Sequence, residues 1–318
     1  MEFNTIREWA IELGFCDAAL CSAAPFDAEK QRVLSQPELS ERRQLRFHPQ
    51  HDDKRTRSIA VFLWPYNQGK QPEGRHIFVD SYYADSNDDY HAERKLEERI
   101  QASGRFAKAN VSYPAKEAAV RAGLGIIGDN SLLITQAHGT RVIIILIALG
   151  LQAPDVQPQR GGCLHCGCCA NNCPSGAIDE KGMSHPERCL RNFMMEGIIA
   201  PEDSRQAMGN RLIGCDICQR VCPMQPNGEH ESGNARWIID DFVTGDSSEF
   251  SSNVKRLADE IGKNAARPQR IRAQAALLCG NIGNRGDLSV LREWSKSEFA
   301  AVREHALWAI QQIESKPV

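Results

Sequence analysis

Residues 163–174 read CLHCGCCANNCP, and residues 215–223 read CDICQRVCP. The first stretch has the spacing C-x2-C-x2-C-x3-C-P, which holds a cubane [4Fe-4S] cluster, and the second begins a similar run. Thiolates two residues apart on a tight loop reach different iron atoms of one cube, while the cysteine before the proline turns toward the other cluster. The two stretches therefore predict a pair of [4Fe-4S] clusters and a chain that transfers electrons.

Crossed ligation divides these cysteines into two ligand sets. The first set is Cys163, Cys166, Cys169 and Cys222. The second set is Cys173, Cys189, Cys215 and Cys218. Cys189 lies between the two stretches, whereas a simple ferredoxin would hold all four cysteines inside its second run. Its position indicates a protein other than a simple ferredoxin.

Zinc and disulfides are the alternative uses of these cysteines. Zinc sites usually take two C-x2-C pairs and lack the x3-C-P ending. Disulfides would require an oxidising compartment, which no other feature of the sequence supports. Outside the two sets, Cys16, Cys21 and Cys279 have apolar neighbours and are expected in the core, whereas Cys168 could compete with Cys169 as a ligand.

The chain has 318 residues, enough for two or three domains, and a net charge of -3. This charge excludes a protein that is basic overall, although residues 54–57 and 267–272 form local basic stretches that are either solvated faces or RNA-binding patches. Residues 1–14 predict an amphipathic helix and not a signal peptide, and the longest apolar run, 142–151, is too short to span a membrane. We expect a soluble protein of the reducing cytoplasm, with no membrane partner.

The pattern of apolar residues predicts an α+β fold in three parts. Residues 1–152 form an α/β domain, with strands at 58–64 and 141–149 and helices at 89–101 and 115–122. Residues 153–228 form a ferredoxin-like unit that the clusters hold in place of a large core. Residues 229–318 begin with a polar linker and continue as helices at 270–291 and 300–313, in the manner of HEAT repeats that offer a docking surface.

Residues 123–128 read GLGIIG and match the spacing of a dinucleotide-binding fingerprint. That fingerprint requires a strand before the glycines, and here a predicted helix precedes them. A nicotinamide or flavin site is therefore not expected. The glycines provide either a tight turn from helix to strand or a close approach of the backbone to a large flat molecule.

The order of these pieces resembles the epoxyqueuosine reductase family, whose members use cobalamin and iron-sulfur clusters to complete the queuosine base of transfer RNA. The shared pieces are Arg57-Ser58, Pro65-Tyr66, Tyr83-Ala84, Asp89-Tyr90-His91, residues 121–128, the first cysteine run, Cys189, residues 214–219, Cys222-Pro223 and the HEAT-like helices. The resemblance covers nearly the whole chain, and the interval between Cys173 and Cys189 is the one that this family uses.

The resemblance implies that residues 1–152 bind a corrinoid and that the clusters pass electrons to it from a flavodoxin or ferredoxin type of donor. It also implies a monomeric enzyme that removes the epoxide oxygen from a flipped-out wobble nucleoside, so that the anticodon loop of transfer RNA is the expected partner. The residues that it places around the corrinoid are Arg57, Gly123, Gly125, Asn130, Ser131, Thr135, Gly139 and Thr140.

The chain departs from the family around the expected reaction centre. The family's proton donor is an aspartate in a D-x-x-P-x-x-E stretch, and Val111 stands in its place here. Tyr113 and Asp129 are the candidate replacements, and a proton donor must lie within hydrogen-bonding reach of its substrate. Met224-Gln225 also replaces a tryptophan-asparagine pair.

These departures leave several functions open. The first is a corrinoid and iron-sulfur reductase that acts on epoxyqueuosine or on another substrate. The second is an electron-transfer protein that reduces the corrinoid of a partner, with the helical module as the docking surface. The third is a ferredoxin-like unit fused to an inert scaffold.

Overall fold

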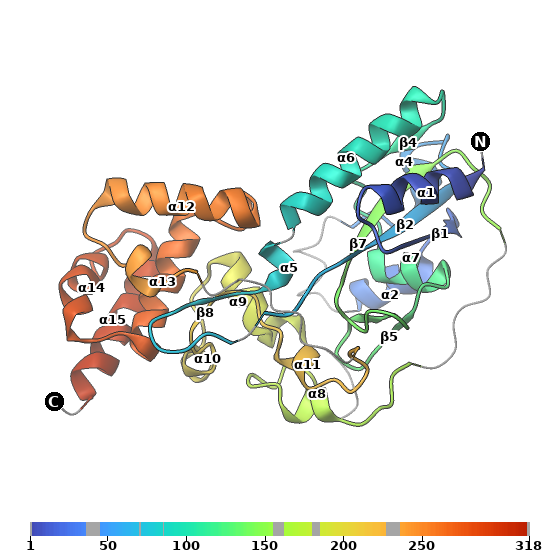
Figure 1. The fold of residues 1–318 in the computed structure, drawn as a ribbon. Coiled ribbons are helices and arrows are strands. Elements are labelled where there is room, and N and C mark those ends of the chain that lie inside the picture. The colour runs from blue at the N-terminus through green and yellow to red at the C-terminus, as the bar shows by residue number, and fades with distance from the viewer. Residues whose placement is uncertain are drawn as a thin grey trace.

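The computed structural model describes residues 2–35, 45–69, 71–84, 86–154, 162–179, 185–226 and 236–316. Figure 1 shows a sheet with its covering helices at one end, the C-terminal helices at the other, and the cysteine-bearing segments between them. The mixed α/β fold agrees with the expected fold class. The predicted boundary between residues 228 and 229 lies outside the described residues, and the division at 152, 228 and 229 stays a prediction.

A four-stranded antiparallel sheet forms the centre of the N-terminal part. Its order is β1 (Asp17–Ser22), β2 (Ser58–Pro65), β7 (Val142–Leu149) and β4 (Ala107–Lys108). The two central strands are the two that the apolar runs predicted. They are apolar at nearly every position because helices cover both faces of the sheet, so that both alternating sets of side chains are buried.

The two faces of this sheet have separate cores. On one face, Phe62 and Ile147 pack against helices α1 (Phe3–Glu12) and α6 (Ser86–Ala102). On the other face, Val61 and Leu146 pack against α7 (Ala115–Arg121). These three helices confirm the helices predicted near the N-terminus, at 89–101 and at 115–122. The shorter elements of this part are α2 (Asp27–Leu34), α4 (Pro49–Asp52) and the hairpin of β5 (Ile126–Ile127) and β6 (Leu133–Ile134).

The C-terminal part is helical. Its helices are α12 (Ser247–Ile261), α13 (Pro268–Ile282), α14 (Leu288–Trp294) and α15 (Ala300–Ser315). The single helix predicted at 270–291 was wrong, because the chain turns at Gly283 and Asn284 caps a short 3-10 turn (Arg285–Asp287) before α14 begins. Two further 3-10 turns lie at Pro186–Arg188 and Ile239–Asp241.

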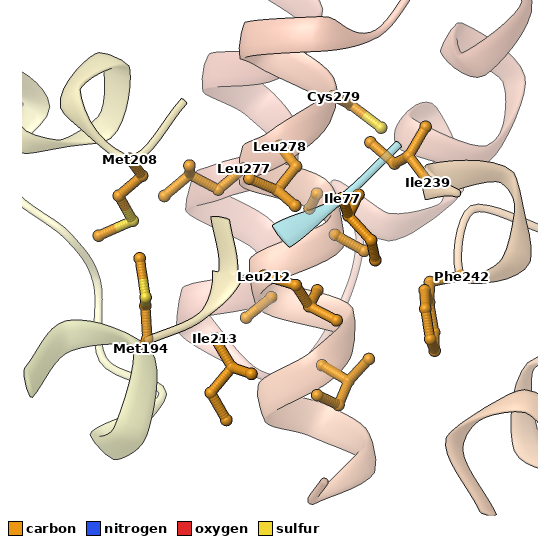
Figure 2. Close-up of a cluster of buried hydrophobic side chains, with 14 of the residues drawn as sticks. Ile77, Met194, Met208, Leu212, Ile213, Ile239, Phe242, Leu277, Leu278 and Cys279 are labelled. Carbon is orange, nitrogen blue, oxygen red and sulfur yellow. The ribbon is translucent and has the colours of Figure 1, made fainter. Parts of the chain in front are cut away.

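The core of the C-terminal part includes residues from much earlier in the chain. Strand β3 (Phe78–Val79) pairs in parallel with β8 (Arg211–Ile213), and α5 (Ser81–Ala84) follows β3. Figure 2 shows Ile77 between Ile239 and Leu278, with Met194 and Met208 on the far side of the same cluster. Met194 lies on α9 (Leu190–Glu196), and Met208 directly follows α10 (Glu202–Ala207). This core therefore joins segments from all three predicted parts.

An ion-pair network holds the early segment to the helical core. The Arg75 guanidinium lies 2.6 Å from Asp240 and 3.1 Å from Asp287. Asp287 is nearly buried, so the pair is less screened by solvent than an exposed one would be.

Buried His305 on α15 predicts a pH dependence of stability. Its Nε2 accepts a hydrogen bond from the Ala200 N–H, and its Nδ1–H donates to the Ala273 carbonyl, so the ring is neutral. Burial lowers the pKa of His305 from 6.5 to about 4. The unfolded chain binds the proton more readily than the folded protein does. The contribution of neutral His305 to the free energy of unfolding is therefore complete above about pH 6.5, and it is lost as the pH falls toward 4, by up to about 3 kcal/mol.

We expect His305→Gln to abolish this dependence. Urea unfolding at about pH 7.5 and about pH 5.5 should show a stability difference between wild type and variant that shrinks at the lower pH. His91→Gln, at an exposed position of α6, is the matched control and should follow the wild type. A constant difference between wild type and His305→Gln would contradict the assignment.

Candidate cluster and substrate site

The first cysteine set comes together in a small cavity. Its four members line a space of ≈ 20 Å³ together with Cys168, Asp129 and Met224. Helix α8 (Cys168–Asn171) packs on α11 (Ile217–Arg220), and this contact brings Cys222 from the second stretch to the first. We call this space the smaller cavity. The structure thus places Cys222 with Cys163, Cys166 and Cys169, as crossed ligation requires.

The second cysteine set lines a larger cavity of ≈ 380 Å³, which lies between the sheet and the helical core. Its cysteines are Cys173, Cys189, Cys215 and Cys218. Cys189 immediately precedes α9, and Cys215 follows Gly214 at the end of β8. Elements far apart in the sequence therefore bring the isolated Cys189 to the other three thiols. We call this space the larger cavity.

Cys168 lies in the smaller cavity but donates to a neighbouring thiol. Its backbone N–H and its side chain both hydrogen-bond to Cys166, which lowers the pKa of Cys166 and raises the pKa of Cys168. Cluster ligands are thiolates, so this geometry favours Cys166 as a ligand and leaves Cys168 as a donor beside it. Position does not distinguish Cys168 from Cys169, because both line the smaller cavity.

The glycines of residues 123–128 serve the packing of the chain itself. Gly123 has φ +75° directly after α7, where a left-handed residue ends a helix. A Cβ at Gly125 would lie 2.4 Å from the Ile134 carbonyl oxygen, and one at Gly128 would lie 2.6 Å from the Ile134 side chain. Of the two interpretations, the structure favours the tight turn, and Gly123 and Gly125 do not line the larger cavity.

Two of the eight residues implied for the corrinoid line the larger cavity, namely Asn130 and Thr140. The Thr140 hydroxyl is 3.2 Å from the Gln219 side-chain oxygen. The Ser131 carbonyl accepts a hydrogen bond of 2.6 Å from Lys116, a residue of the cavity wall. The remaining residues do not line this cavity, namely Arg57, Gly123, Gly125, Ser131, Thr135 and Gly139.

The positions of Arg57 and Gly139 explain why they lie outside the lining. Arg57 precedes β2 and donates its N–H to Leu149, at the end of β7 opposite to the cavity-lining Val142. A Cβ at Gly139 would lie 2.5 Å from the Gln225 side-chain oxygen, so this glycine allows close contact within the protein. Gln225, which stands where the resemblance expects an asparagine, thereby joins Gly139 and Thr140 to the second cysteine stretch.

Neither candidate acid lies in the larger cavity. Tyr113 is buried in the core beneath the sheet, with its hydroxyl 3.5 Å from the Pro49 carbonyl, and burial raises its pKa to about 12. Asp129 lines the smaller cavity, where its carboxylate is 2.8 Å from Nδ1 of His165. Both residues therefore lie outside the larger cavity that the second cysteine set lines.

Asp80 is the acid that the sequence reasoning missed. It is the one carboxyl residue among the described residues that line the larger cavity, and it is buried. Burial, followed by the nearby charge of Asp216, raises its pKa from 3.8 to about 7. The available sequence signal was an aspartate directly after the apolar run 77–79, a position where a short buried strand ends.

Aromatic and basic side chains complete the wall around Asp80. Tyr66, Tyr82 and Tyr83 line the cavity, and the Arg191 guanidinium lies 5.8 Å and 5.5 Å from the rings of Tyr82 and Tyr83. The cavity thus combines thiols, a carboxyl group with a raised pKa, phenols and cations. A largely apolar cavity with a few polar groups and a carboxyl group of raised pKa is typical of a functional site.

Comparisons with known proteins identify the relatives of this chain. Residues 162–225 match the family described as a 4Fe-4S double cluster binding domain, which confirms the prediction of two clusters for this segment. An epoxyqueuosine reductase of Xanthomonas campestris is 30% identical, over 83% of this chain and 82% of its own length. One of Escherichia coli strain K12 is 29% identical, over 98% and 89% respectively.

Solved structures share the fold. A crystal structure of epoxyqueuosine reductase with an epoxyqueuosine-modified transfer RNA stem loop has a TM-score of 0.84 at 22% identity, covering 98% of this chain and 90% of its own. The epoxyqueuosine reductase of Streptococcus thermophilus has a TM-score of 0.81 at 19% identity, covering 99% and 91%. Among the described residues, no helix has the length and apolar character needed to cross a bilayer.

Proposed function

Because this chain belongs to the epoxyqueuosine reductase family, we propose that it is an iron-sulfur and cobalamin-dependent reductase that converts epoxyqueuosine to queuosine in transfer RNA. The observation that carries the proposal is the position of the second cysteine set in the wall of the larger cavity, beside Asp80 and three tyrosines. Electrons and a proton can therefore reach the same space. The names of the relatives, and the transfer RNA stem loop held by one of the solved structures, support the substrate.

The two cysteine sets fit two clusters. Five cysteines line the smaller cavity, Cys168 among them, and four line the larger cavity, so that each offers the four thiols that a [4Fe-4S] cluster requires. The first cluster takes Cys163, Cys166, Cys169 and Cys222, and the second takes Cys173, Cys189, Cys215 and Cys218. Bound there, the clusters supply transfer of single electrons. The sets adjoin, because Cys169 of the first acts electrostatically on Cys218 of the second.

The lining of the larger cavity fits a corrinoid. The apolar side chains of Leu132, Val142 and Ile144 suit the flat faces of the macrocycle, and Asn130 and Thr140 offer hydrogen-bonding groups to its polar edge. Bound there, a corrinoid supplies the reduction that breaks the epoxide C–O bond. The chain itself orients the reactants in a cavity between two packed cores.

The anticodon loop of transfer RNA is the macromolecular partner in this proposal. A single-stranded loop can present one unstacked base to a cavity without the unpairing energy that a duplex requires. On the C-terminal helices, Arg267 and the half-exposed Phe299 border a groove of ≈ 500 Å³ and offer a charge and a stacking surface to RNA. The proposal includes a HEAT-like arrangement of these helices, a monomeric enzyme of the cytoplasm and a flavodoxin or ferredoxin type of electron donor.

A single-turnover experiment tests the proposal. The anaerobically reconstituted protein is titrated with cobalamin, whose visible bands report binding, and is then mixed with a reductant and an epoxyqueuosine-modified anticodon stem loop. We expect cobalamin to bind and the stem loop to acquire queuosine in one turnover, detected by mass spectrometry. A protein that holds its clusters but leaves the cobalamin spectrum unchanged would overturn the corrinoid part, and cobalamin binding without product would overturn the substrate.

One observation favours a second function. The family's acid is Val111 here, and neither Tyr113 nor Asp129 lies in the larger cavity. A protein that only reduces the corrinoid of a partner would need no proton donor. Cobalamin binding and reduction without any reaction of the stem loop would be the result in its favour.

A further inference from the structure

We propose that Asp80 is the proton donor of this site and takes the place of the aspartate that Val111 has replaced. The inference depends on the proposed function, because it concerns the proton that the same reduction consumes. The first argument is position. Among the described residues, Asp80 has the one carboxyl group that lines the larger cavity, and the second cysteine set lines the same cavity.

The backbone fixes Asp80 in this wall. Its N–H donates to the Ile213 carbonyl at 2.9 Å, which extends the pairing of β3 with β8. Its side chain accepts a hydrogen bond of 3.1 Å from the Tyr82 N–H. Gly214 makes room for it, since a Cβ there would lie 2.2 Å from the Asp80 Cβ. The carboxyl group therefore has a defined place between two strands.

The neighbouring carboxylate is already committed to other partners. Asp216 lies 2.7 Å from Arg220 and accepts hydrogen bonds from Gln68 at 2.9 Å and Gln71 at 3.4 Å. Asp80, by contrast, has the Tyr82 N–H as its side-chain hydrogen-bond donor within the described part of the chain. The Asp80 carboxyl group thus retains the capacity to hold a proton and to donate it into the cavity.

The charges around Asp80 keep that proton in place near neutral pH. Burial and the Asp216 carboxylate raise its pKa to about 7, while the Arg191 and Arg220 guanidinium groups act in the opposite direction. Tyr66, Tyr82 and Tyr83 also interact electrostatically with Asp80. A general acid works best when its pKa lies near the working pH.

The proton accounts for one part of a balanced reaction. An epoxide, two electrons and two protons give an alkene and water, with the electrons supplied one at a time by a low-potential electron donor through the clusters. Asp80 gives its proton to the epoxide oxygen as the first C–O bond breaks, so that the oxygen stays on the neighbouring carbon as a hydroxyl group and not as an oxyanion. The second proton then lets this group leave as water when the second C–O bond breaks and the alkene forms. Solvent supplies the second proton and reprotonates the Asp80 carboxylate.

The test compares Asp80→Asn with a matched control. Asparagine keeps an oxygen that can accept the Tyr82 N–H and removes only the transferable proton. The control is Glu93→Gln, which alters another buried carboxyl group with a raised pKa, whose hydrogen bond comes from Asn110 N–H in the N-terminal part. Iron content and the cobalamin spectrum confirm that both variants are loaded.

We expect Asp80→Asn to slow single turnover by about 10²- to 10⁴-fold, and Glu93→Gln to react at the wild-type rate. The wild-type rate should fall as the pH rises above about 7, because the acid form of Asp80 is then lost. A loaded Asp80→Asn protein that turns over at the wild-type rate would overturn the inference while leaving the proposed function intact.

A second readout needs no turnover. A protonated carboxyl group absorbs in the infrared at a C=O stretch that a carboxylate lacks. We expect a carboxylic-acid band in the wild type that disappears in Asp80→Asn, remains in Glu93→Gln and shifts when cobalamin fills the cavity. If the wild type does not react with the stem loop, the proposed substrate is wrong, but the infrared band still tests Asp80. Absence of this band near neutral pH would overturn the inference.

Discussion

Cys222→Ala is expected to lose about half of the iron of the reconstituted protein and to retain the second cluster. Cys222 belongs to the second stretch in sequence, yet it lines the smaller cavity with Cys163, Cys166 and Cys169. A [4Fe-4S] cluster that loses one thiolate loses a quarter of its protein ligands, and a metal-held loop loses its folded form with the metal. Iron content and the electron paramagnetic resonance of the reduced protein measure the loss.

The comparison with two other alanine variants identifies which cluster is lost. Cys222→Ala and Cys163→Ala should give the same spectrum, which retains the signal of the second cluster. Cys215→Ala should lack that signal. Cys279→Ala is the matched control, because this thiol is buried in the helical core and lines neither cavity. A Cys222→Ala spectrum that matches Cys215→Ala would show uncrossed ligation and would contradict the two ligand sets.

Gly214→Ala is expected to lower the free energy of unfolding by about 2–5 kcal/mol. Gly214 has φ +83°, a conformation that costs an alanine about 1–2 kcal/mol. Its Cβ would also lie 2.2 Å from the Asp80 Cβ, and overpacking of this kind costs about 1–3 kcal/mol. Urea unfolding of the anaerobic protein, followed by circular dichroism, measures the sum.

Gly104→Ala separates the two costs. Gly104 has a similar φ of +78°, but an added Cβ would meet nothing within 4 Å. Its variant should therefore lose only the conformational part. Equal losses for the two variants would mean that β8 shifts to accommodate the methyl group, and that the contact with Asp80 is not tightly packed.

The sequence predicted the parts of the molecule that depend on local patterns. The runs around Val61 and Leu146 are apolar on both alternating faces, and such a run predicts a buried central strand wherever it lies in a chain. The cysteine spacing likewise predicted that Cys222 shares a cavity with Cys163, Cys166 and Cys169, because the geometry of a cluster restricts the spacing of its ligands. Spacing alone did not assign Cys189, which was added because the second set lacked a fourth ligand.

The contacts between distant segments could not be predicted in this way. Strand β3 has two residues, Phe78 and Val79, too few for a periodic signal, and its partner β8 follows far along the chain. Asp80 stayed unrecognised for the same reason, since only the pairing of β3 with β8 brings it to the cysteines. The glycines of residues 123–128 gave a signal that was ambiguous, because the same spacing fits both a tight turn and a ligand site.

The position of Ile77 in the helical core has a consequence for synthesis of the protein on the ribosome. This residue emerges long before its neighbours Ile239 and Leu278, so the core around it cannot close until most of the chain has been made. The wall that carries Asp80 needs both β3 and β8, so it forms only after β8 has been made. The nascent chain therefore carries all its cysteine loops before helix α13 docks against α9 and β8, the elements next to Cys189 and Cys215.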